Sequence, residues 1–419
     1  MLWLGALIVI LVFVGIIRKY ETRLVLFLGG LAMAVISGNY WMALDGFTKA
    51  MVNPGLVPII CTVMGFAYVM KLTQCDLHLV HLLTRPLSKL RLLLIPGAVL
   101  VTFMTTMALP SAAGASAAVG AVLIPALAGA GVHPVATAAA IFCGTWGGAF
   151  NPGDSHITFV ANMAHVEPLM VVSSHKVASL SALVVIMITL TGVIYFRKEH
   201  TGYQSPEELQ VETKHLKINP LKAFIPVVPL VLIVLGSKLV GIIPGGVTVP
   251  QAMMIGIGLS FLATLTDIQQ MSRRFFDGMG DAYGHVIGII AAAAAFTSGM
   301  QAIGLTKALV EVMKSSESIA KLAATFGPLI IAFLSGSGDA ATLAFNSSIT
   351  PHAEQFNLGV VQLGTQAFLS GAFGRTLSPV AGAAIILAGL AQISPIELTK
   401  RNFIPMIGAA LTSMIILLG

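Results

Sequence analysis

Charged side chains are scarce in this sequence. Of its 419 residues, only 10% are Asp, Glu, Lys or Arg, whereas soluble globular domains average about 25%. Hydrophobic residues make up 56% of the chain and the mean hydropathy is +0.92. The stretch 197–222 is the one long polar exception. This composition argues against a soluble protein and predicts an all-α polytopic membrane protein.

Cysteine is also rare, and its placement excludes two further classes. Cys61, Cys75 and Cys143 lie in or beside apolar runs without paired spacing. We therefore expect neither a disulfide framework nor a metal site. The N-terminal apolar run lacks a basic segment before it and a small-residue cleavage site, and Arg18 follows it. This pattern predicts a retained first span and not a secretory signal peptide.

The formal net charge of +6 does not indicate a nucleic-acid partner, because the basic residues cluster in short connections between apolar runs. In membrane proteins such clusters mark the cytoplasmic side. The predicted cytoplasmic clusters are Arg18/Lys19/Arg23, the loop from Lys71 through Arg85, Lys89 and Arg91, the stretch 197–222, Arg273/Arg274 and Lys400/Arg401.

Apolar runs predict a long series of membrane segments, because about 20 apolar residues cross the hydrocarbon core of a bilayer. The predicted segments are 2–17, 24–39, 55–71, 91–109, 116–132, 134–166 (broken), 169–196, 222–241, 247–265, 284–302, 324–335, 340–350, 358–393 (broken) and 402–418. The basic clusters fit one orientation only if 91–132 enters and leaves on the same face. That stretch is therefore predicted to be a re-entrant hairpin with its tip at 109–116.

The two halves of the chain resemble each other. Residues 143–168 line up with 370–395 without gaps, and Pro152 falls on Pro379. Each half then contains about five spanning helices and one hairpin, so the halves are expected to insert in opposite orientations. Inverted repeats with broken helices are a carrier architecture. The predicted domains are repeat 1 at 1–196 (hairpin about 91–132, broken helix about 134–166), a cytoplasmic linker at 197–221 and repeat 2 at 222–419 (hairpin about 324–352, broken helix about 358–393).

Two segments carry polar and helix-breaking residues inside apolar runs. They are "FNPGDS", 150–155, and "RTLSP", 375–379. Within a bilayer, an unwound backbone is tolerated only where protein or water satisfies its polar groups. We therefore expect both breaks and both hairpin tips to meet at the membrane midplane. The half-helix ends there can hold an anion or a cation.

Ionisable residues in these segments are the strongest site candidates, since a buried charge is costly unless it is paired. Arg375 offers a planar fork suited to a carboxylate, or a structural partner for an acid. Asp154 and Asp339 could bind a coupling cation, Na⁺ or H⁺, or pair within the fold. His156 could titrate, donate to substrate or be a satisfied core residue. No metal ligand set and no organic cofactor are expected.

Hydroxyl and amide groups near the tips and breaks complete the candidate set. Packing of small residues between helices is the alternative for any single one of them. The candidates for substrate binding are Ser111, Ser116, Asn151, His156, Ser335, Ser337, Thr342, Asn346, Arg375, Thr376 and Ser378.

The C-terminal stretch 370–401 closely resembles the signature of the DcuC-type anaerobic C4-dicarboxylate carriers. Gly374 to Pro379 ("GRTLSP"), Ile393 to Pro395 and the "SGSG" of 335–338 stand in family positions, as does the pair Gly153–Asp154. The resemblance implies transport of fumarate, succinate and related diacids across the bacterial inner membrane, by exchange or ion-coupled movement. It also implies a homodimer in which mobile transport domains move against a scaffold in an elevator-type cycle.

One departure from the family pattern concerns Asp339. The family pattern has Asn after Ser-Gly-Ser-Gly, whereas this chain has an acid there. A carboxylate beside a dianion repels the substrate unless it is protonated or holds a cation.

Two other functions fit parts of the pattern. A cation/proton antiporter on the same scaffold would use Asp154 and Asp339 as its ion site. An intramembrane aspartyl protease of the GxGD type would use the same two acids as a dyad with carboxyls about 3 Å apart. The other copy of the hairpin, at 110–115, has no acid, which disfavours the protease.

Overall fold

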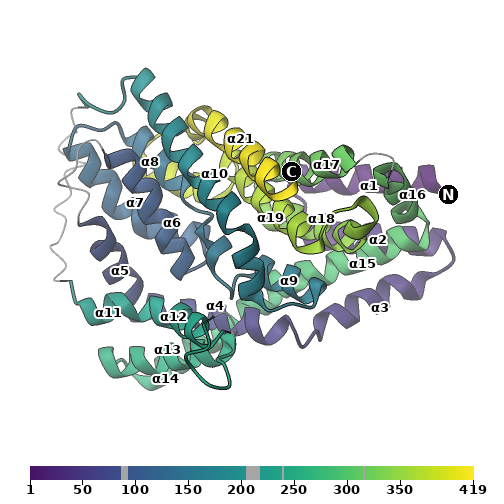
Figure 1. The fold of residues 1–419 in the computed structure, drawn as a ribbon, viewed down its shortest axis with the longest axis horizontal. Coiled ribbons are helices and arrows are strands. Elements are labelled where there is room, and N and C mark those ends of the chain that lie inside the picture. The colour runs from purple at the N-terminus through teal and green to yellow at the C-terminus, as the bar shows by residue number, and fades with distance from the viewer. Residues whose placement is uncertain (86–92, 204–217, 238–239, 315–316) are drawn as a thin grey trace.

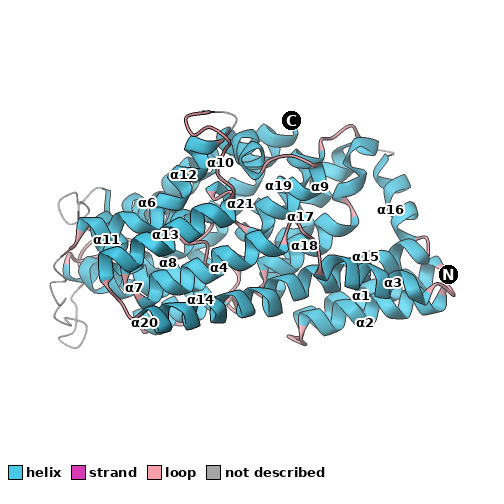
Figure 2. Ribbon diagram, turned by 90° about the horizontal axis from the view of Figure 1, so that it is seen from below, coloured by secondary structure: helices cyan, strands magenta, loops and turns pink. Residues whose placement is uncertain are grey.

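The computed structural model describes residues 1–85, 93–203, 218–237, 240–314 and 317–419. Its regular elements are all helices, and no strand occurs within these ranges (Figure 2). Six helices are long and apolar enough to cross a membrane, and α4 with α5 adds a seventh if this pair, bent by 76°, is one span. The predicted class, an all-α multi-pass membrane protein, is confirmed.

The helices keep the order that the apolar runs predicted. Before the polar stretch they are α1 (Leu2–Ile17), α2 (Thr22–Ile36), α3 (Tyr40–Met51), α4 (Val57–Leu72), α5 (Cys75–Thr84), α6 (Leu94–Ala108), α7 (Ala112–Gly129), α8 (Pro134–Cys143), η3 (Gly147–Phe150), α9 (Ser155–Ala164) and α10 (Pro168–Phe196). After it they are α11 (Pro220–Phe224), η5 (Ile225–Val227), α12 (Val228–Gly236), α13 (Val249–Thr264), α14 (Ile268–Ala282), the π-helical turn η6 (Tyr283–Ile287), α15 (Gly288–Ala302), α16 (Leu305–Lys314), α17 (Glu317–Ser335), α18 (Gly338–Ser348), η7 (Thr350–Phe356), α19 (Val360–Leu377), α20 (Gly382–Ala391) and α21 (Ile396–Leu418).

Two helical hairpins have tips of only two or three residues. Leu109–Ser111 connects α6 to α7, and Gly336–Ser337 connects α17 to α18. Ser111 accepts a hydrogen bond from the Gly114 amide (3.1 Å), and Ser337 accepts one from the Ala340 amide (3.3 Å). Both tips therefore turn into the next helix through the same serine cap, which satisfies an amide that the first helical turn leaves free.

Two helices are interrupted, as predicted. The first break separates α8 from α9, where Asp154 caps α9 by accepting from the His156 amide (2.9 Å). The second break lies between Leu377 and Gly382. Helix α19 continues two residues beyond Arg375, so the prediction that 375–379 is unwound is wrong for Arg375, which belongs to the last helical turn.

Hairpins and broken helices pack into one body. A single buried cluster runs from Phe103 of α6 and Phe142 of α8 to Phe373 of α19 and Leu387 of α20. The helices α2 and α3 pack instead on α15, and α13 and α14 pack on α4 (Figure 1). A hairpin, a broken helix and a long helix thus follow one another in this order twice along the chain. The opposite membrane orientation of the two halves stays a prediction.

Four helices lie where no membrane segment was predicted: α3, α5, α14 and α16. Polar residues interrupt the apolar residues of these helices, so a search for continuous apolar runs does not find them. Arg273 and Arg274 consequently lie on α14 and not in a loop. The basic residues Lys89 and Arg91 and residues 204–217 of the linker lie outside the described residues.

Close packing between α2 and α15 depends on glycine. A Cβ added to Gly30 would lie 2.4 Å from the carbonyl oxygen of Ala295. We expect Gly30→Ala to force the two helices apart and lower the melting temperature of the protein in detergent, at a cost of about 1–3 kcal/mol. Gly258→Ala is the matched control, because nothing lies within 4 Å of the added carbon. A Gly30→Ala protein as stable as the control would contradict this packing.

Candidate functional site

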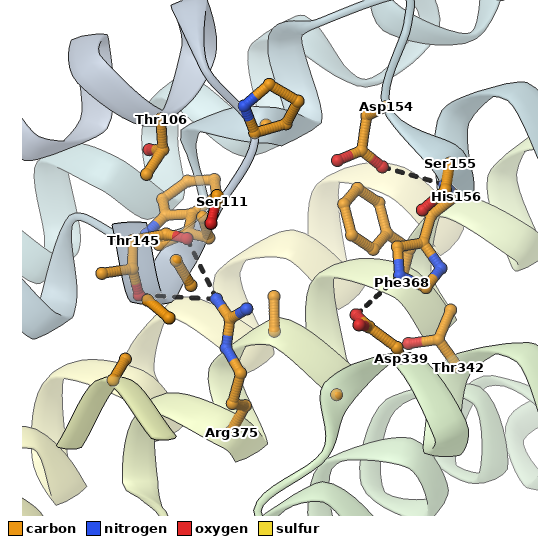
Figure 3. Close-up of a pocket in the computed structure, with 18 of the residues that line it drawn as sticks. Thr106, Ser111, Thr145, Asp154, Ser155, His156, Asp339, Thr342, Phe368 and Arg375 are labelled. Carbon is orange, nitrogen blue, oxygen red and sulfur yellow. Dashed lines mark hydrogen bonds and ion pairs between the residues drawn. The ribbon is translucent and has the colours of Figure 1, made fainter. Parts of the chain in front are cut away.

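A polar cavity of about 310 Å³ lies between the two hairpin tips and the two broken helices (Figure 3). We call it the central cavity. Its volume is at the lower end of the range for pockets that hold small organic molecules. Helix α4 and the π-helical turn contribute Met64 and Val286 to its wall. Its polar and aromatic lining residues are Thr106, Ser111, Thr145, Trp146, Asp154, Ser155, His156, Asp339, Thr342, Phe368 and Arg375.

Arg375 provides the positive charge of the central cavity. Its Nη2 donates to the Thr145 carbonyl oxygen (3.0 Å) and to the Thr145 hydroxyl (3.4 Å). Its Nε is buried and has no hydrogen-bond partner among the described residues. Arg375 also forms no ion pair with any residue that the structure describes, so Asp154 and Asp339 act on its charge only from a distance. A guanidinium with neutral partners and free N–H groups can accept a carboxylate ligand.

The opposite wall carries two carboxylates and an imidazole (Figure 3). His156 Nε2 lies 3.0 Å from Asp339 Oδ1, a contact that links α9 to α18 across 183 residues of chain. The His156 ring is buried and stacks on Phe368, with ring centroids 4.6 Å apart. The Asp339 side chain is 60% exposed, although it lies among packed helices, because it faces the cavity. Asp154, which caps α9, lines the same wall.

The charges of the central cavity balance only when His156 is protonated. Arg375 brings one positive charge, whereas Asp154 and Asp339 bring two negative charges when both are ionised. His156 can add one positive charge if it takes up a proton, because its unperturbed pKa lies near physiological pH. Opposite charges held on separate walls leave space between them. A ligand with its own charged groups can interact with both walls at once.

The structure brings six of the predicted site residues to the central cavity and leaves the others outside its wall. The six are Ser111, Asp154, His156, Asp339, Thr342 and Arg375. Ser335 and Ser337 line a different cavity, on the outer side of the second hairpin tip. Ser116, Thr376 and Ser378 are buried within the helix packing. For the residues outside this cavity a direct binding role stays a prediction.

Asn151 and Asn346 hold backbone in place. The Asn151 side chain donates to the Met107 carbonyl oxygen (2.9 Å) and accepts from the Gly153 amide (2.8 Å). The Asn346 side chain donates to the Gly364 carbonyl oxygen (3.1 Å) and accepts from the Thr350 hydroxyl (2.8 Å). Each therefore ties a hairpin to its neighbouring broken helix.

Several cavity residues were not among the predicted candidates. Thr145 and Thr106 lie beside the first break, and the Thr106 hydroxyl accepts from the Gly147 amide (3.0 Å) and contacts the Gly144 carbonyl oxygen (3.2 Å). Phe368 lies seven residues before Arg375 on α19. Helical spacing puts residues seven apart on one face, so this periodicity could have identified Phe368 from the sequence.

A multi-pass membrane protein with broken helices around a cavity lined by charged side chains has the architecture of a transporter. Comparison with known proteins specifies the family. Residues 47–419 match the family model of DcuC, the C4-dicarboxylate anaerobic carrier. The chain belongs to this family.

The two acids that the protease alternative would use as a dyad have other contacts in the structure: Asp339 contacts His156, and Asp154 caps α9.

Individual relatives agree with the family assignment. An uncharacterized transporter of Haemophilus influenzae is 35% identical over 270 residues, which cover 62% of this chain and 97% of the relative. The anaerobic C4-dicarboxylate transporter DcuC of Escherichia coli K12 is 25% identical over 445 aligned positions, covering 97% of this chain and 94% of the relative. A probable anaerobic C4-dicarboxylate transporter DcuC of Vibrio cholerae is 26% identical over 380 aligned positions, which cover 86% of this chain and 81% of the relative.

The buried contacts of Asn346 predict a structural role. We expect Asn346→Ala to leave the buried Thr350 hydroxyl without its acceptor and to destabilise the protein by about 1–3 kcal/mol. Thermal unfolding in detergent measures this loss. Asn39→Ala is the control, because Asn39 is exposed and makes no capping hydrogen bond. A direct binding role for Asn346 would instead show as weaker ligand affinity at unchanged stability.

Proposed function

We propose that the protein is a secondary active transporter that moves C4-dicarboxylates, such as fumarate and succinate, across the bacterial inner membrane. One observation carries this proposal: the guanidinium of Arg375 faces a cavity of small-molecule size with only neutral partners. Membership of a dicarboxylate carrier family agrees with that geometry. A buried arginine without an acidic partner is costly, and a substrate carboxylate supplies the missing charge.

The two carboxylates of the substrate would bind different parts of the central cavity. Arg375 takes one through its free N–H groups in a charge-assisted hydrogen bond. The Ser111 hydroxyl lines the same cavity and is available to the other, whereas Thr342, beside Asp339, already donates to the Ala367 carbonyl oxygen (3.4 Å). The N-terminal ends of α7 and α18 begin at the hairpin tips, and their positive dipole ends favour an anion there.

The transported dianion needs accompanying cations. With the substrate bound, four negative charges would oppose the single positive charge of Arg375. Such an imbalance in a low-dielectric cavity is costly. We therefore place one or more coupling ions, H⁺ or Na⁺, at Asp154 and Asp339. The contact between His156 and Asp339 supports a proton as one of them, because an imidazole and a carboxylate can share one.

Transport would follow an elevator-type cycle in a homodimer. The first hairpin, both broken helices and one arm of the second hairpin share one buried core, and α18 packs on α17 and α19, which makes them suited to move as a rigid unit. Helices α2, α3, α4, α13, α14 and α15 pack among themselves and would form the static scaffold. The central cavity lies between these two groups, since Met64 and Val286 reach it from the scaffold side. Movement of the unit would expose the cavity to each side in turn.

A cation/proton antiporter remains the second candidate, and the acidic wall of the central cavity favours it. In that case Asp154 and Asp339 would bind the transported ion, and Arg375 would only balance charge. Uptake of labelled succinate into proteoliposomes, compared with sodium flux in the same vesicles, separates the two functions. Sodium flux that does not respond to succinate would favour the antiporter.

Arg375 provides the most direct test of dicarboxylate binding. We expect Arg375→Ala to reduce fumarate uptake in proteoliposomes by about 100-fold or more, because a buried charged contact is lost. Arg375→Lys should also impair uptake, since an ammonium lacks the planar fork. Arg273→Lys is the matched control, on exposed α14. Full uptake with unchanged KM in Arg375→Ala would exclude this role.

Asp339 tests the coupling. Asp339→Asn removes one negative charge and restores the residue of the family pattern, so we expect transport to continue with about one cation fewer per substrate. The ratio follows from the membrane potential and pH gradient at which net flux reverses. Asp45→Asn, an exposed position on α3, should leave the ratio unchanged. An unaltered ratio in Asp339→Asn would remove Asp339 from the coupling site.

A further inference from the structure

A second cavity, of about 280 Å³, lies on the other side of the second hairpin tip. We call it the outer cavity. The α1–α2 connection contributes Lys19, the start of α2 contributes Arg23, and the π-helical turn contributes His285; Ser335 ends α17 and Ser337 lies in the hairpin tip. Its size is close to that of the central cavity, so it has room for a ligand of the same class.

Two short segments border both cavities. At the hairpin tip, Ser337 lines the outer cavity and Asp339 lines the central one. In the π-helical turn, His285 lines the outer cavity and the adjacent Val286 lines the central one. Gly336 adopts φ +80°, a conformation that glycine tolerates best. Both segments are thus unusual local structures, and π-helical turns are often found at functional sites.

The outer cavity carries an uncompensated positive charge. Arg23 pairs with Glu21 and donates to the Gly284 carbonyl oxygen (2.6 Å). Glu21 also caps α2 by accepting from the Leu24 amide (2.7 Å). His285 contacts Asp281 (2.8 Å). Lys19 forms no ion pair with any residue in the described part of the chain, so its ammonium determines the net charge.

The hydroxyl of Ser337 adds a hydrogen-bond donor beside this charge. Its oxygen accepts from the Ala340 amide, which leaves its own O–H free to donate to a carboxylate. Ser335 is less available, because its hydroxyl donates to the Ile331 carbonyl oxygen (2.7 Å). An ammonium together with a free hydroxyl is a suitable pair for a carboxylate group.

We propose that the outer cavity is a second binding site for the small dicarboxylate, occupied before or after passage into the central cavity. This inference rests on the proposed transport function. Lys19 attracts the dianion, Ser337 donates to one of its carboxylates, and the tip around Gly336 separates the two sites. Because Lys19 and Arg23 belong to a predicted cytoplasmic cluster, we expect this site to face the cytoplasm.

Thiol labelling of purified protein in detergent tests the outer cavity directly. The three native cysteines are buried, so a cysteine placed by Ser337→Cys is the reactive thiol. We expect anionic sulfonatoethyl methanethiosulfonate to react faster than its cationic trimethylammonium analogue. Lys19→Gln should reduce this rate ratio about fivefold, because one nearby charge is removed. Lys307→Gln, at an exposed position on α16, should not change it. If Ser337→Cys does not fold, Ser335→Cys replaces it.

Protection by substrate tests binding at this site. Succinate should slow labelling of Ser337→Cys, whereas propionate should not. Lys19→Gln should raise the succinate concentration for half-protection of Ser337→Cys but not of Ala113→Cys in the central cavity, a lining position without a proposed binding role. Protection confined to Ala113→Cys, or a rate ratio unaffected by Lys19→Gln, overturns the outer site and leaves the transport function standing. Protection of neither cysteine removes both proposals.

Discussion

Each interrupted helix leaves backbone amides and carbonyls without helical partners at a depth where lipid can bond none of them. Much of the polar chemistry of this protein satisfies those groups. Asp154 caps α9, and Ser111 and Ser337 cap the helices that begin at the tips. Thr399 donates to the Leu377 carbonyl oxygen (2.7 Å) at the end of α19. Side chains that could bind a ligand are thus partly committed to the fold.

The same constraint explains the arrangement of charge. Arg375 is held by a backbone carbonyl and a hydroxyl of Thr145, partners that fix its direction without cancelling its charge. A salt bridge to Asp154 or Asp339 would have been an equally simple way to bury it. The contact of Asp339 with His156 instead keeps one acid on the far wall. Positive and negative walls therefore persist across a gap that a charged solute can fill.

Hydropathy and the internal duplication predicted most of the architecture, because continuous apolar runs and paired helix-breaking residues can be recognised in the amino-acid sequence. They predicted both hairpins, both broken helices and the long helices α10 and α21. Amphipathic helices such as α3 and α14 were not predicted, since their apolar residues are spaced by the helical period and do not form a continuous run. The end of α19 was misplaced because Arg375 and Thr376 are compatible with helix, and only the following Ser378–Pro379 stops it.

Local geometry limited the prediction of the site. Ser335, Ser337 and Asp339 are close in sequence, yet the first two face one cavity and the third faces another. The division falls where the tip turns into α18 at Gly338, and sequence alone does not specify which way each side chain faces. Thr145 was missed because its binding partner, Arg375, is 230 residues away.

Two polar contacts in the walls of the central cavity join the halves of the chain. Arg375 of the second half donates to Thr145 of the first, and His156 of the first half contacts Asp339 of the second. Each links one side of a broken helix to a segment of the other half. A dianion between the walls adds a partner to Arg375 and alters the charge that His156 and Asp339 experience. Occupancy of the cavity therefore changes the contacts that hold its two sides together, which couples binding to any movement between them.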